Sequence, residues 1–132
     1  MESVNFKVNL FKRPLDRKES ELILHLMLDT LVKINLIYYR NHDKIPSIYK
    51  AGVKYLAEDG IEDWKSIPEI IRDGYGDCED LASWRVAELQ KQGINARPFL
   101  KSRKLGNFFQ YHVQVQFPNG FIEDPSLKLG MR

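Results

Sequence analysis

The sequence contains only one cysteine, Cys78, in 132 residues. A single thiol cannot form an intramolecular disulfide, so the chain does not need an oxidising compartment to fold. The first residues contain no apolar run between a basic start and a small-residue cleavage site, which is the pattern of a secretory signal. We therefore expect a cytoplasmic protein and not a disulfide-stapled secreted one.

A strong charge of either sign is also missing. Twenty basic residues face eighteen acidic ones, a formal charge of +2, so we expect no nucleic-acid partner. The longest apolar stretch, from Leu22 to Tyr39, is interrupted at four-residue spacing by His25, Asp29 and Lys33. Charges are costly inside a bilayer, so this stretch predicts a buried amphipathic helix and no membrane partner.

Repeats, linkers and low-complexity tracts are absent, and the length suits one domain over residues 1–132. Its first part, residues 1–73, is predicted to be mainly helical. The hydrophobic periodicity predicts a strand over 3–11 and helices from Asp16 or Arg17 to Arg40, over 47–56 and over 64–71.

Residues 74–126 carry the more specific pattern. Asp77 is a good N-cap, Asp80 can complete a capping box, and Gly93 ends the helix predicted from Cys78 to Gln92. Three predicted strands follow, over 96–103, 108–117 and 121–124. This order indicates an α+β fold: N-terminal helices, then a central helix that bears the cysteine and packs on an antiparallel sheet.

Cys78 falls at the start of this central helix. Unpaired N–H groups and the helix dipole stabilise a thiolate there, and the same N–H groups could bind an oxyanion during acyl transfer. The acidic Asp77, Glu79 and Asp80 oppose this by raising the thiol pKa. The site therefore requires a cationic histidine beside the sulfur.

His112 and Asp124 are predicted to meet on a β-hairpin. The turn at 117–121 has Pro, Asn and Gly in the order that a three-residue loop prefers, and this loop pairs Phe117 with Phe121. Gln114 then lies opposite Asp124, which places His112 one diagonal step from Asp124 on the same face. A base and its orienting carboxylate need this arrangement.

The phase of the strand argues the other way. His112 alternates in phase with Gln110, Gln114 and Gln116, and out of phase with Val113 and Val115. If the valine face packs on the central helix, His112 points away from Cys78. A sheet covered on both sides or a bulge near His112 would resolve the conflict.

Four blocks in this region resemble consecutive motifs of the transglutaminase-like superfamily, whose core is similar to papain. They are GDCEDLA at 76–82, GINAR at 93–97, YHV at 111–113 and EDPS at 123–126. Small phage-encoded members look closest, which would also allow a virion-associated protein. The resemblance covers about residues 74–126, and Val113 stands where the family usually has a tryptophan after the histidine.

Matched block by block, the resemblance implies Cys78 as nucleophile, His112 as base and Asp124 as the residue that orients the base. It implies cysteine-dependent acyl transfer on a peptide or carboxamide substrate, with no cofactor and no metal. A water acceptor makes the protein a peptidase or amidase, and an amine acceptor makes it a transglutaminase. We favour hydrolysis, because nothing in the sequence marks an amine site.

Other interpretations remain open. The chain could be a non-enzymatic virion, assembly or binding module that keeps the fold. No paired ligand spacing supports a metal site built from Cys78, His112 and carboxylates. We expect His25 and His42 to be structural, Asp80 to be a cap and Trp84 to lie in the core. Tyr49 and Tyr55 could line a groove, but packing is the default role for both. A side-chain oxyanion donor is not assigned, with Trp64 and Tyr75 as the candidates.

Overall fold

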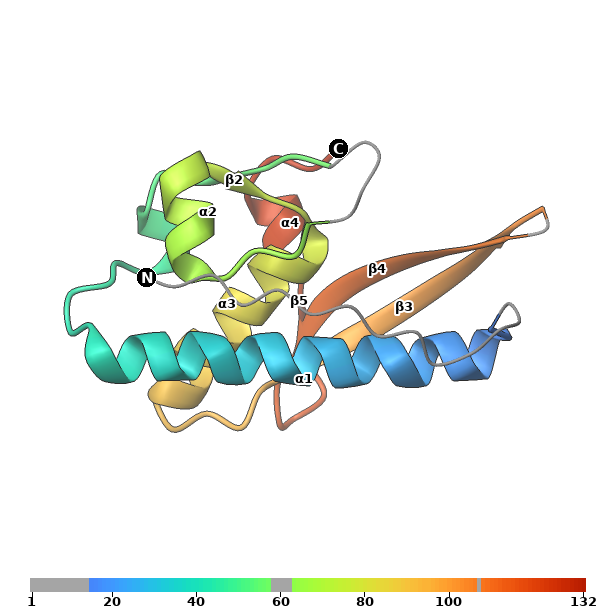
Figure 1. Ribbon diagram of the computed structural model, residues 1–132, viewed down its shortest axis with the longest axis horizontal. Coiled ribbons are helices and arrows are strands. Elements are labelled where there is room, and N and C mark those ends of the chain that lie inside the picture. The colour runs from blue at the N-terminus through green and yellow to red at the C-terminus, as the bar shows by residue number, and fades with distance from the viewer. Residues whose placement is uncertain (1–14, 58–62, 107) are drawn as a thin grey trace.

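The computed structural model describes residues 15–57, 63–106 and 108–132. Figure 1 shows a long helix, α1, that crosses the molecule beneath the shorter helices, with a β-hairpin extending along it. Helix α3 packs on a three-stranded antiparallel sheet of order β3-β4-β5, which confirms the predicted α+β class. The strand predicted over 3–11 lies outside the described residues.

Helix α1 spans Arg17–Asn41, within one residue of the prediction. Asp16 caps it: its side chain accepts the backbone N–H of Glu19, and the Glu19 side chain accepts the N–H of Asp16. The helix packs mainly on α3. Its buried residues are Leu28, Leu31, Val32, Asn35 and Tyr39.

The burial predicted for this helix is correct for one face only. The polar stripe of His25, Asp29 and Lys33 is exposed, as expected, but so are large apolar side chains such as Leu22 and Leu26. Among the described residues, α1 alone is long and apolar enough to cross a membrane, and 28% of its most apolar window is buried. The core helix of a soluble protein can pass the same test, so one such helix is weak evidence for a membrane span.

The segment between α1 and α3 departs from the predictions. A 3-10 helix over Ile48–Lys50 (η1) and a short strand over Lys54–Tyr55 (β1) replace the helix predicted over 47–56. The helix cannot continue because Gly52 has a φ of 76°, in the left-handed region. Strand β1 pairs in parallel with Tyr75–Gly76 (β2), a strand that the sequence pattern did not predict.

The helix predicted over 64–71 forms, but it is shifted along the chain. Helix α2 spans Ile67–Asp73, because Ser66 and Glu69 form a capping box and fix its start. Gly74, with a φ of 84°, ends it. Gly76 follows in a tight place, where an added Cβ would lie 3.1 Å from the Cβ of Asp80.

Helix α3 spans Cys78–Lys91, one residue short of the prediction, and its capping box is confirmed. Asp80, which is fully buried, accepts the backbone N–H groups of Asp77 and Lys65. Trp84 is also fully buried, as expected, and its indole N–H donates to the Tyr39 hydroxyl at 3.0 Å. The helix that carries the cysteine is therefore held on several sides.

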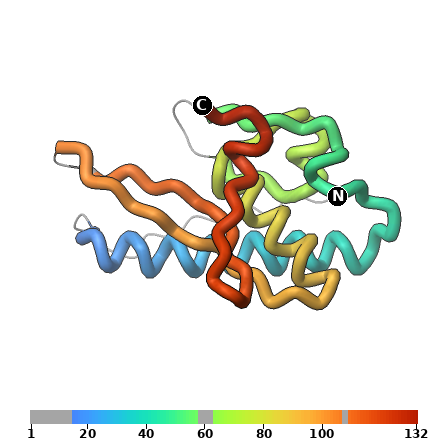
Figure 2. The backbone as a smooth tube through the Cα atoms, turned by 180° about the vertical axis from the view of Figure 1, so that it is seen from behind, coloured from blue at the N-terminus to red at the C-terminus, as the bar shows by residue number. Residues whose placement is uncertain are grey.

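The three predicted strands are confirmed as β3 (Arg97–Leu105), β4 (Phe108–Gln116) and β5 (Ile122–Glu123), followed by the short helix α4 (Pro125–Lys128). Strand β4 is paired with β3 along its whole length but with β5 only at Val115 and Gln116. The β3–β4 hairpin therefore runs beyond the rest of the sheet and lies along α1 (Figure 2). Arg17 of α1 donates to the Ser102 hydroxyl on β3 at 2.7 Å.

Candidate active site

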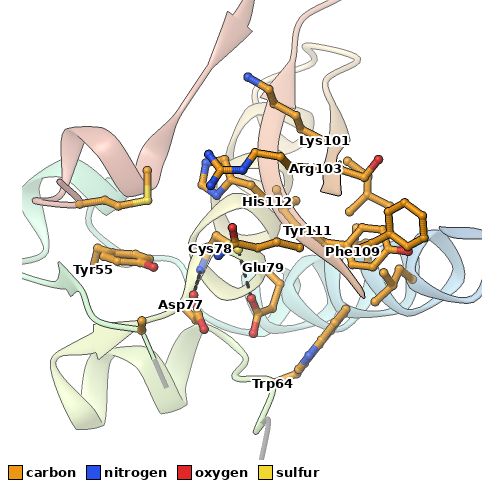
Figure 3. Close-up of a pocket in the computed structure, with 18 of the residues that line it drawn as sticks. Tyr55, Trp64, Asp77, Cys78, Glu79, Lys101, Arg103, Phe109, Tyr111 and His112 are labelled. Atoms are coloured by element: carbon orange, nitrogen blue, oxygen red, sulfur yellow. Dashed lines mark hydrogen bonds between the residues drawn. The ribbon is translucent and has the colours of Figure 1, made fainter. Parts of the chain in front are cut away.

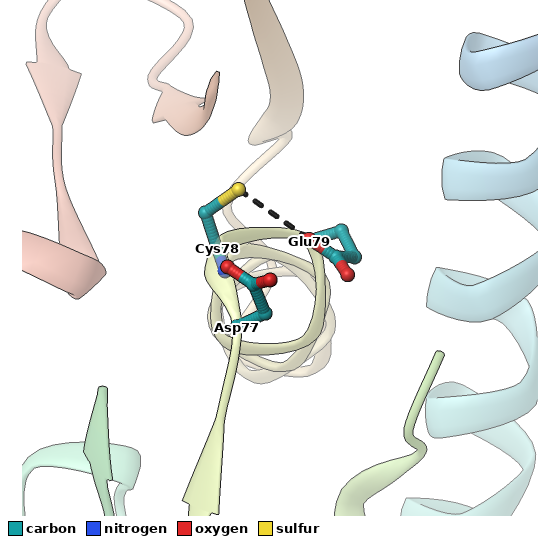
Figure 4. Close-up of side chains that lie close together, drawn as sticks. All are labelled: Asp77, Cys78 and Glu79. Atoms are coloured by element: carbon teal, nitrogen blue, oxygen red, sulfur yellow. Dashed lines mark hydrogen bonds between the residues drawn. The ribbon is translucent and has the colours of Figure 1, made fainter. Parts of the chain in front are cut away.

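Cys78 is the first residue of α3, and it is 9% exposed. Its thiol donates to the Glu79 carboxylate, with Sγ 3.4 Å from Oε2 (Figure 4). Burial first, and then the nearby negative charge of Glu79, raise the pKa of the Cys78 thiol well above its ordinary value, although a backbone hydrogen bond from Val113 acts to lower it. The cysteine of this structure is therefore a neutral thiol and not a thiolate.

The expected oxyanion site at the start of α3 is not free in this structure. The backbone N–H of Cys78 donates to the Asp77 side chain at 2.7 Å. The same carboxylate also accepts the N–H of Asp80 as part of the capping box. The cap that starts the helix therefore occupies the donors that the sequence analysis had assigned to the oxyanion.

The hairpin has the predicted register. The N–H of Phe117 donates to the carbonyl of Phe121 at 2.8 Å, and Val115 pairs with Glu123. His112 and Asp124 consequently share a face, and Nε2 of His112 lies 2.8 Å from Oδ2 of Asp124. The side chains are 26% and 14% exposed, so the contact is largely shielded from water.

Further hydrogen bonds hold the carboxylate of Asp124. Its Oδ2 also accepts the side-chain N–H of Gln114 at 3.2 Å, and its Oδ1 accepts the N–H of Leu127 as the N-cap of α4. Burial acts to raise the pKa of Asp124, but these hydrogen bonds and the one to His112 hold that pKa below its usual value. Asp124 is therefore an ionised acceptor.

The charge of Asp124 determines the tautomer of His112. An ionised carboxylate can only accept, so Nε2 must carry the proton that it shares with Asp124. In the neutral ring, Nδ1 then has a lone pair and is the nitrogen that can take up a proton.

His112 and Cys78 line the same pocket, which has a volume of about 740 Å³ (Figure 3). The valine face of β4 does pack inward, with Val113 and Val115 buried, and the β3–β4 pairing is continuous, without a bulge. His112 and Val113 are neighbours on one strand and so project from opposite faces of the sheet. The pocket is nevertheless lined from both faces, by His112 on one and by Tyr111 and Val113 on the other.

No hydrogen bond joins Cys78 to His112 in the described part of the chain, where the thiol donates to Glu79 instead. The backbone hydrogen bond from Val113 to Cys78 shows that the sulfur lies against β4, beside the residue that follows His112. The structure thus places both residues at one pocket, with the thiol proton directed toward the carboxylate of Glu79 and not toward His112.

Tyr55 also lines this pocket, which is the groove-lining alternative to the packing role expected for it. Burial first, and then the charge of Asp77, raise the pKa of Tyr55 to about 12. Its hydroxyl therefore keeps its proton and can donate it. Figure 3 shows the side chain directed toward Cys78. No local pattern in the sequence could have found it, since β1 and its pairing with β2 were not predicted.

The two expected oxyanion donors lie in different places. Trp64 lines the pocket, whereas Tyr75 is not among the lining residues and its ring packs under Lys65, whose Nζ is 3.6 Å from the ring centre. Of the other histidines, His25 is exposed on α1, and His42 contacts the carbonyl of Tyr38 at the end of that helix.

A buried ion-pair network next to Asp124 was also missed. Glu123 is 6% exposed and binds Arg85 of α3, with Oε2 2.7 Å from Nε. The Tyr49 hydroxyl donates to the same oxygen at 2.7 Å, so this tyrosine is more than packing. The network fastens β5 to α3 and thereby sets the position of Asp124 relative to the helix that carries Cys78.

One group of side chains could hold a metal ion by proximity. Ligand atoms of Asp77, Cys78 and Glu79 lie within 4.8 Å of one another. The carboxylate of Asp77 caps α3 and that of Glu79 accepts the thiol proton, so both have a role without a metal. His112 is not part of this group.

Comparisons with protein-family models, with curated proteins and with solved structures found no match to this chain. The resemblance to the transglutaminase-like superfamily therefore stays a prediction from motifs. The function has to be argued from the geometry of the site.

Proposed function

We propose that the protein catalyses cysteine-dependent acyl transfer on a peptide or carboxamide substrate, with Cys78, His112 and Asp124 as its triad. The observation that carries the proposal is the 2.8 Å hydrogen bond from Nε2 of His112 to Asp124, made at the pocket that Cys78 also lines. This bond leaves Nδ1 as the proton acceptor. A histidine with a fixed tautomer and a helix-start cysteine that line one pocket are the components that nucleophilic catalysis requires.

The reaction begins from a neutral thiol, because the pKa of Cys78 is raised. Nδ1 of His112 takes the thiol proton as Sγ attacks the substrate carbonyl carbon, and the resulting imidazolium is stabilised by Asp124. The imidazolium then protonates the leaving amine. The C–N bond breaks, and the acyl group remains on Cys78 as a thioester.

The negative charge on the carbonyl oxygen needs a donor other than the capped N–H of Cys78. We assign this role to the hydroxyl of Tyr55, which lines the pocket and stays protonated because its pKa is raised to about 12. A hydroxyl that is already held in place stabilises an oxyanion that develops in the transition state.

The acceptor decides the name of the reaction. Water, activated by Nδ1 of His112, gives hydrolysis and makes the protein a peptidase or amidase. One feature favours an amine: the carboxylates of Asp77 and Glu79 line the pocket next to the sulfur and can attract an ammonium group. We therefore keep transglutaminase activity as the second candidate.

Trapping the acyl-enzyme tests the proposal. The protein is incubated with an activated acyl ester or a glutamine peptide, quenched in acid, and weighed by mass spectrometry. We expect a thioester on Cys78 in the wild type, none in Cys78→Ala, and slow formation in His112→Ala. Adding an amine before the quench separates the two acceptors, because the products are an acid or an amide.

Equal labelling of the wild type and Cys78→Ala would contradict the proposal. Unchanged labelling in His112→Ala would show that the imidazole does not activate the thiol. Either result favours the alternative of a non-enzymatic binding or assembly module.

A further inference from the structure

Three cationic side chains share one face of β3, and none of their direct cross-strand partners is acidic. Arg97, Lys101 and Arg103 alternate along the strand and so project to the same side. Cross-strand partners on an antiparallel pair share a face. Their partners on β4 are, in the same order, Gln116, His112 and Gln110.

Lys101 and Arg103 are exposed and form no ion pair with any described residue. Arg85, in contrast, binds both Glu88 and Glu123. Two unpaired cations on one face repel each other, and an anion between them would relieve the repulsion.

Lys101 and Arg103 are also the two members of this set that reach the pocket of Cys78. Figure 3 shows both on the His112 side of the pocket, with Asp77 and Glu79 on the other side of the sulfur. The pocket thus has a cationic side on the hairpin and an acidic side at the start of α3. A ligand that spans it would place negative charge over the hairpin.

We propose that Lys101 and Arg103 form a subsite for the carboxylate of an anionic acyl donor, a peptide with an acidic group near its reacting carbonyl. Arg103 can bind a carboxylate through two parallel N–H groups, and Lys101 adds a point charge. The carboxylate is supplied by an acidic side chain or by a free C-terminus. The inference rests on the proposed function, because the peptide is an acyl donor only if Cys78 is acylated, but its binding can be measured without turnover.

The test measures peptide binding by calorimetry to Cys78→Ala, which cannot turn the substrate over. Three peptides of one length are compared: an amidated peptide with Glu, the same peptide with Gln, and the Gln peptide with a free C-terminal carboxylate. We expect at least one carboxylate peptide to bind about tenfold more tightly than the neutral one, the size of a charge-assisted contact. Raising the salt concentration should reduce the difference.

Three variants locate the subsite, each made in the Cys78→Ala background. Lys101→Gln and Arg103→Gln should remove most of the preference for the carboxylate peptide. Lys104→Gln is the matched control, because Lys104 is equally exposed on the same strand but faces the other way and does not line the pocket. It should keep the preference. Since all three residues are exposed, none of the changes disturbs the core.

The subsite would be overturned if the three peptides bound with equal affinity or if none of them bound. An effect of Lys104→Gln as large as that of the other two variants would also overturn it. Tight, salt-dependent binding of an oligonucleotide without any preference among peptides would assign this face to a polyanion and would also overturn it. Thioester formation on Cys78 without a carboxylate preference would end this inference alone. A carboxylate preference without any thioester would end the proposed function alone.

Discussion

On the hairpin side of the pocket, His112 is bound to an ionised Asp124 through a bond that fixes its tautomer. On the helix side, the thiol of Cys78 keeps its proton in a hydrogen bond to the carboxylate of Glu79, and the residue is 9% exposed. In the proposed mechanism, the base is thus ready before substrate arrives, whereas the nucleophile is not. We infer that the thiol loses its proton in the step that forms the new bond, as a serine nucleophile does, and not in a pre-formed ion pair.

The largest effect should come from removing the charge of Asp124. Asp124→Asn keeps a side chain that can cap α4, so the fold should persist, but it can donate to Nε2 and so reverse the tautomer. We expect the acylation rate of Cys78 to fall by about 1,000- to 10,000-fold, as for other triads that lose this carboxylate. Single-turnover kinetics measures this.

Asp29→Asn, which removes an exposed carboxylate on α1, is the control. Full activity of Asp124→Asn would make this residue a structural cap only. The bond from His112 to Asp124 would then not prepare the histidine for catalysis.

The next effect concerns the network that holds the hairpin side in place. Glu123→Gln leaves Arg85 without its closest carboxylate, and we expect a loss of about 2 kcal/mol in the free energy of unfolding, somewhat below the cost of breaking a fully buried pair. Urea unfolding measures it. Asp43→Asn, in the exposed segment after α1, should be neutral.

The same residue predicts a pH dependence. Burial acts to raise the pKa of Glu123, but Arg85 and Tyr49 hold it below its ordinary value. The charged form therefore stabilises the fold above about pH 4.3, the unfolded value, and this contribution is lost as the pH falls through the folded pKa. Unfolding curves between pH 6 and pH 3 should converge for the wild type and Glu123→Gln. Parallel curves would show that Glu123 titrates normally.

An effect on the chemical step alone is expected from Tyr55→Phe. Loss of one oxyanion donor should lower the maximal acylation rate by about 100-fold and leave substrate binding nearly unchanged, because the donor acts on charge that develops only in the transition state. Tyr111→Phe is a matched control, since Tyr111 lines the same pocket from β4. An effect on KM alone would make Tyr55 a binding residue.

The smallest effect is expected from a substitution on the helix side of the pocket. Glu79→Gln removes one of the charges that raise the pKa of Cys78, and burial remains. The rate of alkylation by iodoacetamide should therefore rise a few-fold at neutral pH, and its pH profile should shift to lower pH. Superimposable profiles for Glu79→Gln and the wild type would show that burial alone keeps the thiol neutral.

Different segments of the chain also differ in how well their structure follows from the local sequence. The helix from Cys78, the three strands and the His112–Asp124 contact are predictable, because caps and a specific turn act over a few residues. Strand β2 and the place of Tyr55 are not, since they depend on Gly52 and on pairing between distant segments. The shifted start of α2 follows from the local capping box of Ser66 and Glu69, which the hydrophobic periodicity does not register. The raised thiol pKa required the burial of Cys78, which no pattern around that residue reveals.

The neutral thiol has a consequence for oxidative damage. Peroxides attack the thiolate, so a protonated and nearly inaccessible sulfur should be oxidised slowly. Once a sulfenic acid did form, the sequence contains no second cysteine to condense with it. Recovery would depend on a small external thiol that can enter the pocket, and overoxidation would be irreversible. The burial and the nearby carboxylate that keep Cys78 protonated thus also protect a residue that the sequence offers no second thiol to repair.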